Sequence, residues 1–590
     1  MIVVGLITGV GGVVTSDERP PVGQAPSINN TTTAEERQVA QSESQSSSEQ
    51  LQTYAVTAHS ADAIDTAQLA EYGEVGTQVD ERIELTMASS DVDAVRNISW
   101  VTNVRPVMRP ELDQTETDIP GSSDGESLGV QQAHENGITG EGAKVGVIDT
   151  GFDPDNQAIE SNVVNTQSYR DSVGDPKHGT SVAEIVTRTA PDSQLLLVSA
   201  GTGTDVEAAI DYLRGQDVDI IVFSGGFVIP EDDGTHFLTD EINDATDDGT
   251  LFISAAGNYA QRHWEGQFRD TDSDDYHEWA ENGDELNCLP DCNTGYSGEI
   301  TVYIAWSDTG EESHYRASLV NPVTRKTIVS DDNRPVATSS TRRYTKLSVG
   351  NIRSQPVDLV IDHVSGPADD EIEVIITDGP REMQRNIPAS SISAPADVPT
   401  ALAVAAYQRG PRQIAPYSSR GPTDDGRTGV GVTGYTNIMI ANELYESRDI
   451  FTGTSAATPY VGGVAALVED DQPGDQSPTE LRSTLRSSSD DIRAPGTDTV
   501  SGPGVVNAAD AVNVRETSEP TETPAPTPEP TETSTPTPEP TETSPSVVEE
   551  YDRNDDGEIS ITELGLAGQA FANGDLTIIE LGQVAAEFAS

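Results

Sequence analysis

Residues 451–461 read Phe-Thr-Gly-Thr-Ser-Ala-Ala-Thr-Pro-Tyr-Val and hold one serine, Ser455, among small neighbours. The apolar, Ala/Gly-rich run from Val461 to Val468 that follows is typical of a buried helix. A hydroxyl at a helix N-terminus, on a backbone bare enough for a substrate to approach, is favoured as a nucleophile because the helix end stabilises developing negative charge. Taken alone, the stretch is also compatible with a Gly/Ser turn that caps a core helix.

Two further segments supply the partners that a nucleophilic serine needs. A short apolar strand over 143–149 ends in Asp149, and His178 opens an amphipathic helix over 178–190. A serine hydroxyl is a poor nucleophile until a base takes its proton, and an acid has to orient that base. The chain order Asp149, His178, Ser455 is one of the known orders for such a triad. The sequence therefore predicts a serine nucleophile, a histidine base and an orienting aspartate.

Five sequence blocks together resemble the subtilisin-like serine proteases, or subtilases. They span about residues 125–515 in family order and read VGVIDTG, HGTSVAEI, LFISAAGN, YSSRGP and FTGTSAATPYVGGVAAL. The resemblance implies that Ser455 attacks the scissile carbonyl, that His178 acts as general base and then general acid, and that Asp149 holds the imidazole. It also implies that the Asn258 side-chain amide and the Ser455 N–H form the oxyanion hole.

The same resemblance implies a substrate cleft between the ends of two strands. The first strand, over 217–223, would pair with an extended substrate, and its end would face the end of a strand over 250–255 across the pocket for the P1 residue. The residues of these two walls are Ser224, Gly225, Gly226, Ala255, Ala256 and Gly257. Because no acidic residue lies in the walls, we expect a broad preference for apolar or aromatic P1 residues.

Strand-like and helical runs alternate through this region, which favours an α/β fold with a parallel sheet and helices on both faces. Catalytic residues at strand ends and helix starts suit such a sheet. The strands are predicted over 143–149, 194–200, 217–223, 250–255 and 400–407, and the helices over 178–190, 204–214, 235–247, 458–470 and 478–488.

The region before the catalytic domain divides into three predicted segments. Residues 1–15 are expected to be an export signal of atypical form, because no basic residue precedes the apolar run, and residues 16–50 to be disordered. Residues 51–112 read as strand, helix, strand, helix, strand and resemble the small α+β propeptide of subtilases. Such a segment would block the cleft until a cut within 111–127. An ordinary accessory domain is the alternative.

A long insertion separates Asn258 from Ser455 and is expected to form an inserted β-sandwich over about 262–390. Alternating runs at 299–306, 357–362 and 371–377 support this prediction. The insertion could bind substrate or carbohydrate, or it could be decoration without a ligand. The chain has two cysteines, Cys288 and Cys292, and we expect a local disulfide formed in an oxidising compartment.

The C-terminal region combines a spacer with a predicted calcium site. Residues 516–546 are rich in Thr, Pro and Glu, which favours an extended linker. Within the helical module predicted over 547–590, a twelve-residue EF-hand loop is followed by a second loop, over 569–580, that lacks acids at two ligand positions. The expected Ca²⁺ ligands are Asp552, Asn554, Asp556, Glu558, Ser560 and Glu563. The pair of loops resembles a dockerin, which implies a cohesin-like or surface partner.

The charge composition predicts a salt-adapted protein of halophilic type. The chain has 100 acidic and 33 basic residues and a formal net charge of −67. Such a chain repels itself in dilute buffer, whereas molar salt shortens the Debye length to about 3 Å and screens the repulsion. A nucleic-acid partner is excluded because phosphate contacts need basic patches, and no stretch suits a stable membrane span.

The function expected from the sequence is that of an extracellular or cell-surface, salt-dependent serine endopeptidase made as an inhibited precursor. One alternative is a catalytically silent, subtilase-like binding protein displayed through its calcium-binding tail. Another is a sedolisin-like acid peptidase, which would need an acidic residue at position 258 and a Glu/Asp pair in place of His178. The intact set of Asp149, His178, Asn258 and Ser455 favours the endopeptidase.

Overall fold

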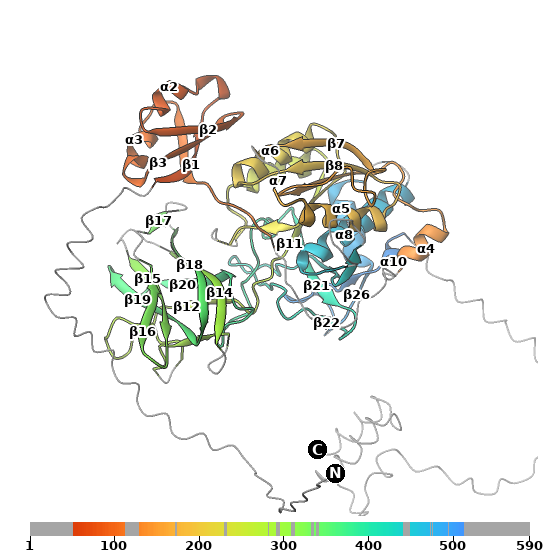
Figure 1. Cartoon of the computed structure of the whole chain (residues 1–590). Helices are drawn as coiled ribbons and strands as arrows, with labels where there is room; N and C mark the ends of the chain where they lie inside the picture. The colour runs from red at the N-terminus through yellow and green to blue at the C-terminus, as the bar shows by residue number, and fades with distance from the viewer. Residues whose placement is uncertain are drawn as a thin grey trace, which may run out of the picture. The chain divides into compact units, whose positions relative to one another are not determined.

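The computed structural model describes about seven-tenths of the chain, in several stretches (Figure 1). These are residues 51–112, 129–170, 174–228, 233–280, 283–290, 295–307, 313–331, 335–337, 342–440, 449–472, 474, 476–493 and 495–512. The predictions for residues 1–50 and 516–590, including the calcium loop, lie outside the described residues. Among the helices that are described, none is both long enough and apolar enough to cross a bilayer.

The segment from 130 to 512 is organised by a ten-stranded, mostly parallel sheet, which confirms the predicted α/β fold. The strand order is β26-β27-β23-β21-β11-β9-β6-β8-β7, with β22 paired to β21. Only β26 and β22 run antiparallel to their neighbours. The strands are β6 (Lys144–Asp149), β7 (Val163–Ser168), β8 (Gln194–Ser199), β9 (Ile220–Phe223), β11 (Leu251–Ala255), β21 (Leu402–Gln408), β22 (Gln413–Ile414), β23 (Val432–Tyr435), β26 (Ser489–Asp490) and β27 (Val505–Val506).

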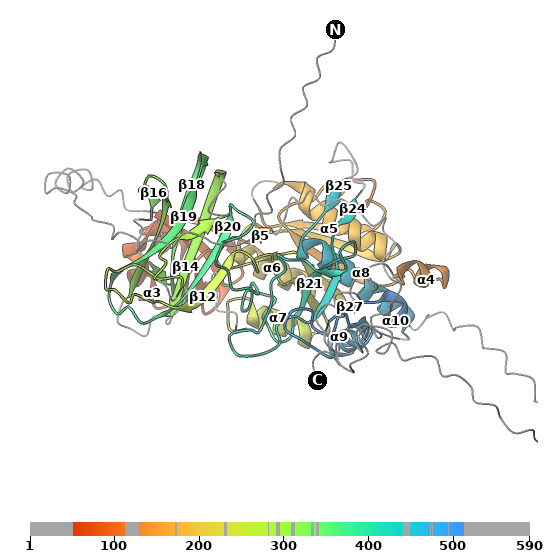
Figure 2. The same ribbon diagram turned by 90° about the horizontal axis from the view of Figure 1, so that it is seen from below.

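Helices cover both faces of this sheet because its strands are apolar on both sides. In β9, Ile220 and Val222 point to one core and Ile221 and Phe223 to the other. The first core holds α5 and α8, which lie side by side (Figures 1 and 2), and the second holds α6 and α7. The helices are α4 (Val130–Glu135), α5 (Pro176–Thr189), α6 (Gly203–Arg214), α7 (Thr239–Asp247), α8 (Thr454–Asp471), α9 (Pro478–Ser487) and α10 (Ala508–Ala511).

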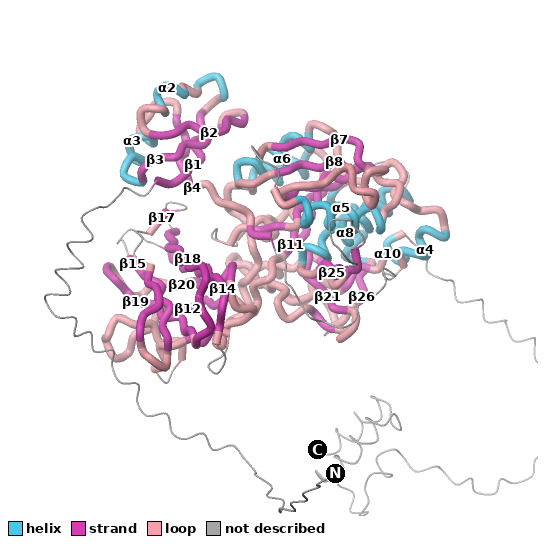
Figure 3. Tube along the Cα trace, viewed as in Figure 1, coloured by secondary structure: helices cyan, strands magenta, loops and turns pink. Residues whose placement is uncertain are grey.

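The insertion folds into two antiparallel sheets around one apolar core, with no helix among its described residues (Figure 3). The five-stranded sheet has the order β12-β20-β14-β18-β17 and the four-stranded sheet the order β13-β19-β15-β16. Cys288 is disulfide-bonded, while Cys292, the only other cysteine of the sequence, lies outside the described residues. The strands are β12 (His263–Gln267), β13 (Asn287–Leu289), β14 (Tyr296–Ser307), β15 (His314–Asn321), β16 (Lys326–Ser330), β17 (Val336–Ala337), β18 (Arg342–Gln355), β19 (Val357–Ser365) and β20 (Glu371–Asp378).

Residues 51–106 form a small module with a four-stranded antiparallel sheet in the order β2-β3-β1-β4. One of these strands, β2 (Gly73–Val79), was not predicted, because it has two glycines and no buried residue. The first of the two helices expected in this region is broken into a 3₁₀ turn, η1 (Ala61–Ala63), and a single turn, α2. The remaining elements are β1 (Leu51–Ala58), α2 (Thr66–Leu69), β3 (Arg82–Ala88), η2 (Ser89–Asp91), α3 (Val92–Arg96) and β4 (Val101–Pro106).

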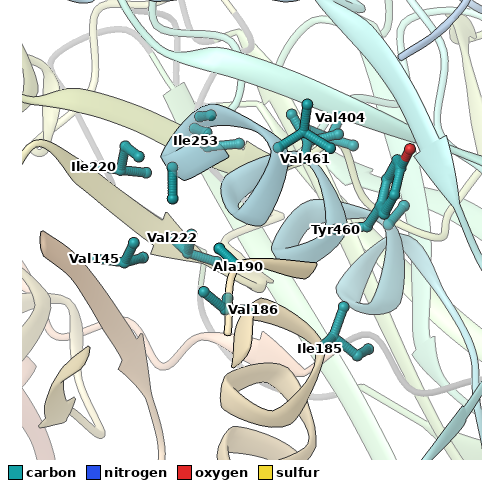
Figure 4. Packing of buried hydrophobic residues seen from close by; sticks show 14 of the residues in the cluster. Val145, Ile185, Val186, Ala190, Ile220, Val222, Ile253, Val404, Tyr460 and Val461 are labelled. Atoms are coloured by element: carbon teal, nitrogen blue, oxygen red, sulfur yellow. The ribbon is translucent and has the colours of Figure 1, made fainter. Parts of the chain in front are cut away.

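Small residues let α8 sit unusually close to its neighbours. A Cβ added to Gly463 would lie 2.4 Å from the Thr189 Cβ of α5, and one added to Gly462 would lie 2.5 Å from a Val222 methyl of β9. Figure 4 shows Val186, on α5, and Val222, on β9, in the same core. The Gly/Ala-rich composition of α8 therefore follows from tight packing between α5, α8 and β9.

The helix α8 starts four residues before the predicted run over 458–470, at Thr454. A helix that begins at 458 has Pro459 in its first turn, where proline is tolerated, whereas the observed helix has this proline one turn further in. Here Pro459 is fully enclosed in the helix, and Ser455 belongs to the first turn rather than to the preceding loop.

The stability of the insertion is expected to depend on pH through Glu265 in β12. Burial, followed by the charges of Glu373, Asp424 and Glu371, raises the pKa of Glu265 to about 7. An unfolded glutamate titrates near pH 4.3, so the folded form binds the extra proton between these values. The contribution of this group to stability is therefore full below the unfolded pKa and is lost as pH rises through 7.

We expect Glu265→Gln to raise the free energy of unfolding at pH 8 by about 1 kcal/mol and to leave it unchanged near pH 4, at constant salt. Denaturant midpoints at the two pH values measure this difference. The exposed Glu160→Gln serves as the matched control. Equal effects of Glu265→Gln at both pH values would contradict the prediction.

Candidate active site

Asp149 ends β6 and holds the histidine at the start of α5. Its Oδ1 accepts from the Thr150 N–H at 2.7 Å, and its Oδ2 lies 2.6 Å from Nδ1 of His178. Asp175 caps the N-terminus of α5 through the Lys177 N–H, so His178 sits in an anchored first turn. With Nδ1–H donating to a buried carboxylate, Nε2 is the basic atom of the ring. That Nε2 is buried and has no hydrogen-bond partner among the described residues.

Ser455 is anchored to the end of β9 by a reciprocal pair of contacts with Ser224. The Ser455 hydroxyl lies 3.0 Å from the Ser224 carbonyl oxygen, and the Ser224 hydroxyl donates to the Ser455 carbonyl at 3.2 Å. Within a helix that carbonyl would accept from the N–H four residues later, but Pro459 has no N–H. The proline therefore releases the Ser455 carbonyl for Ser224, which fixes the position of the nucleophile-bearing turn.

Asn258, three residues after β11, is oriented by Thr454. Its Oδ1 accepts from the Thr454 N–H at 3.0 Å and from the Thr454 hydroxyl at 3.2 Å. Because these two donors fix the oxygen end of the amide, Nδ2 is the end that can donate to a negatively charged oxygen. Thr454 precedes Ser455 directly, so this donor is held beside the serine. The arrangement suits the stabilisation of an oxyanion.

The two helix N-termini bring the two halves of the site together. Asp149 and His178 form one half, while Ser455, Ser224 and Asn258 form the other. The close packing of α5 on α8 joins them, and Phe451 sets its ring edge against the His178 ring at 5.2 Å between centroids. Ser455 is 0% exposed and His178 is 2% exposed, so both side chains are shielded from bulk water.

One predicted cleft wall is occupied by a strand from the N-terminal region. Strand β10 (Gly225–Gly226) pairs antiparallel with β5 (Glu111–Leu112), with Leu112 opposite Gly225 and Glu111 opposite Gly226. This is main-chain pairing of the kind that an extended peptide makes with an exposed strand edge. The cleft strand β5 thus lies where a substrate was expected to bind.

Ser393, which the sequence did not reveal, lies between the two predicted walls. Its N–H donates to the Ala256 carbonyl at 3.0 Å. A Cβ on Gly226 would lie 2.3 Å from the Ser393 hydroxyl oxygen, and a Cβ on Gly257, where φ is +107°, would lie 2.9 Å from it. The glycines are therefore required by the approach of this serine. A long-range contact of this kind leaves no local sequence signal, because Ser393 is far from both walls in the chain.

A second buried histidine–aspartate pair has a different character. His236 Nε2 lies 3.0 Å from the Asp397 Oδ1, and His236 Nδ1 accepts from the Leu238 N–H at 3.2 Å. Asp397 also accepts from the Gly234 N–H at 2.7 Å. Both nitrogens of His236 are occupied, which is typical of a structural histidine, whereas Nε2 of His178 has no hydrogen-bond partner among the described residues.

Among the described residues, one carboxylate group has the spacing of a cation site. It consists of Asp270, Asp272 and Asp274, whose ligand atoms lie within 4.8 Å of one another. These residues belong to the insertion and not to the site around Ser455.

Comparison with known proteins finds proteases that are similar to segments of this chain. Chain segments are 33% identical over 153 residues to the minor extracellular protease Epr of Bacillus subtilis and 29% identical over 139 residues to thermitase of Thermoactinomyces vulgaris. These matches cover 22% and 20% of this chain and 22% and 48% of the relatives, so the chain spans less than half of either one. A solved structure of the Clostridium perfringens CspB protease covers 66% of this chain and 99% of that one, at 15% identity and a TM-score of 0.48.

The subtilase family (peptidase S8) matches residues 140–283 and 339–508, which together make up more than half of the chain. The unmatched stretch between them falls inside the insertion, across β13 to β17. The matched residues carry the whole ten-stranded sheet and all four of Asp149, His178, Asn258 and Ser455. Fold, site geometry and family match agree, and the chain belongs to the subtilase family.

Proposed function

We propose that the chain is a serine endopeptidase that acts through Asp149, His178 and Ser455, with Asn258 in the oxyanion hole. The observation that carries the proposal is the buried contact of Asp149 with His178 Nδ1 at 2.6 Å, which leaves Nε2 of that histidine as a base in a water-poor site. The cleft strand β5, paired to β10, indicates that the ligand is an extended peptide.

In the proposed reaction the Ser455 oxygen bonds to the carbonyl carbon of the substrate while His178 takes the hydroxyl proton. The resulting oxyanion accepts from the Asn258 amide and the Ser455 N–H. Collapse breaks the C–N bond, and His178 returns the proton to the leaving amine. Water then hydrolyses the acyl-enzyme by the same route in reverse, which releases a carboxylate and restores Ser455.

We further propose that residues 51–112 are an inhibitory propeptide. Arg105 of β4 forms a buried ion pair with Glu207 of α6 at 2.6 Å and lies 4.2 Å from the Phe237 ring centre. Arg82 of β3 pairs with Glu207 and with Glu241 of α7. Together with β5 in the cleft, these contacts support a module that holds the site closed. Its removal by a cut beyond Leu112 and before α4 would open the cleft.

The remaining features of the proposal rest on the sequence. The excess of acidic residues supports a halophilic, salt-dependent enzyme, and the bonded Cys288 supports an oxidising, extracellular or cell-surface location. The two sheets of the insertion support a β-sandwich domain. The C-terminal loops are proposed to bind Ca²⁺ and to dock, dockerin-like, on a cohesin-like or surface partner. Calcium titration of the full chain against Glu563→Gln tests this tail, since the variant should lose the bidentate ligand.

The enzyme proposal is tested by a fluorophosphonate probe applied to the processed protein at molar salt. We expect stoichiometric labelling that is lost in Ser455→Ala and lost after desalting, because the triad forms only in the screened, folded state. Circular dichroism of each sample controls for folding. A folded, propeptide-free sample that takes no label would refute the enzyme and favour the catalytically silent binding protein.

A further inference from the structure

The five-stranded sheet of the insertion is apolar on both faces. A sheet at the surface of a domain needs only one apolar face, the one that packs on the core. Along β14, Val302, Ile304 and Trp306 point into the core shared with the four-stranded sheet. Tyr303 and Ala305 point the opposite way and are also buried. We call the outer set of Tyr303, Ala305, Tyr344 and Ile375 the tyrosine face. A face of this kind requires a partner that keeps it out of water.

The partner is found within the same chain. The tyrosine face belongs to one continuous apolar cluster with Phe227 of the catalytic region and with Met108, which joins the N-terminal module to the cleft strand β5. The Met108 carbonyl in turn accepts from the Gly203 N–H, at the start of α6, at 2.8 Å. Met108, in the connection between module and cleft strand, is therefore buried in an apolar cluster to which both the catalytic region and the insertion contribute.

Polar contacts tie the same surfaces together. The Gln52 side chain of β1 hydrogen-bonds the Tyr344 hydroxyl, and Gln52 also accepts from the Tyr54 hydroxyl at 3.3 Å. Burial raises the pKa of Tyr344 to about 12, so this hydroxyl stays neutral in the contact. Burial and the nearby charge of Glu111, in β5, raise the pKa of Tyr303. Strand β17 of the insertion also lies against β4 of the module.

We infer that the tyrosine face is a second docking surface for the N-terminal module and the cleft strand, so that the insertion retains the inhibitor on the enzyme. That the docked segment is an inhibitor rests on the proposed function. The docking itself does not depend on catalysis. The ion pairs on α6 and α7 hold the module from one side, and the tyrosine face holds it from the other. The occupant is this chain's own segment 51–112.

Hydrogen exchange of the full-length Ser455→Ala chain at molar salt tests the docking without any need for activity. Tyr344→Ala in this background is expected to speed amide exchange in β1, β4 and β5 about tenfold, because truncating a buried aromatic anchor typically costs at least the equivalent of one decade in affinity. Gln52→Ala, a substitution in the module itself, is expected to speed amide exchange in the same strands by a smaller factor.

Tyr296→Ala is the matched control. Tyr296 lies in the same sheet, on the neighbouring strand β14, but its hydroxyl donates to the Glu299 carbonyl at 2.7 Å and its ring packs against the inner core. It should leave exchange in β1, β4 and β5 unchanged. If Tyr344→Ala behaves like this control, the inference is overturned. Should Tyr344→Ala unprotect β14 and β20 themselves, Tyr344→Phe, which loses only the hydroxyl, replaces it.

A second readout separates this inference from the enzyme proposal. In chains that keep the native Ser455, the time needed to reach full fluorophosphonate labelling is expected to be shorter for Tyr344→Ala than for Tyr296→Ala. Absent labelling in every variant together with accelerated exchange would leave the docking intact and refute catalysis. Normal labelling at equal rates, with unchanged exchange, would refute the docking and leave the enzyme in place.

Discussion

Asp149→Asn is expected to lower kcat for a chromogenic peptide by about four orders of magnitude and to change KM little. The carboxylate accepts from Nδ1–H of His178 at 2.6 Å, and an asparagine can instead present its NH₂ group to that nitrogen. The ring would then carry its proton on Nε2, where it cannot take the proton of Ser455. Because the substrate contacts are untouched, the loss falls on the chemical step and not on binding.

The buried pair of His236 and Asp397 provides the control for this prediction. Asp397→Asn changes a buried carboxylate that lies 3.0 Å from Nε2 of His236. The other ring nitrogen of this histidine already accepts from the Leu238 N–H. It is expected to lower the unfolding midpoint while kcat of the folded fraction stays within about tenfold of the parent, because it lies outside the triad. Equal losses of kcat in the two variants would show that the effect of Asp149→Asn is one of folding.

The parallel sheet and the positions around Ser455 were predictable because they depend on local patterns. Apolar runs such as 220–223 are buried on both faces, and a parallel sheet with helices on both sides is the architecture that satisfies them. The residues Asp149 and His178 stand at a strand end and a helix start, where the sequence expected them. Short-range periodicity therefore carried most of the information about the catalytic region.

Features that depend on contacts distant in sequence were not predictable. Strand β18 of the insertion alternates irregularly, since most of its second half is exposed apart from Ile352, and it is defined by its pairing with β14. Ser393 reaches the cleft only because β10 and the end of β11 converge on it. The role of Pro459 likewise emerges only once Ser224 is seen to take the carbonyl that the proline leaves unbonded.

The tyrosine face is another feature that could not be predicted from the sequence. The period-two pattern of 299–306 predicted a strand with one apolar face, yet Tyr303 and Ala305, on the other face, are buried as well. A strand that is apolar on both faces points to a covering partner, but the sequence alone does not say that this partner is the N-terminal module. The distance of the module from the insertion in the chain hides a contact that matters for how the cleft is kept closed.

Asn258→Ala is expected to lower kcat by about a hundred- to a thousandfold with little change in KM, because the lost donor acts mainly on the oxyanion that forms in the transition state. The Asn258 Oδ1 is fixed by the N–H and the hydroxyl of Thr454, so Nδ2 is the atom whose removal matters. Steady-state kinetics on the processed enzyme measure the two constants separately. A rise in KM with kcat unchanged would instead assign Asn258 to substrate binding.

Thr454→Val tests whether the Thr454 hydroxyl positions the side-chain amide of Asn258. It removes the hydroxyl contact to the Asn258 Oδ1 at 3.2 Å but keeps the backbone N–H contact at 3.0 Å. A positioning residue of this kind should cost only about three- to tenfold in kcat, since the loss of one of two neutral hydrogen bonds is worth roughly 1 kcal/mol. In the Asn258→Ala background the same substitution should cost almost nothing, because Thr454 then has no amide to orient. Additive losses in the double variant would mean that Thr454 acts on Ser455 directly, through the helix turn that the two residues share.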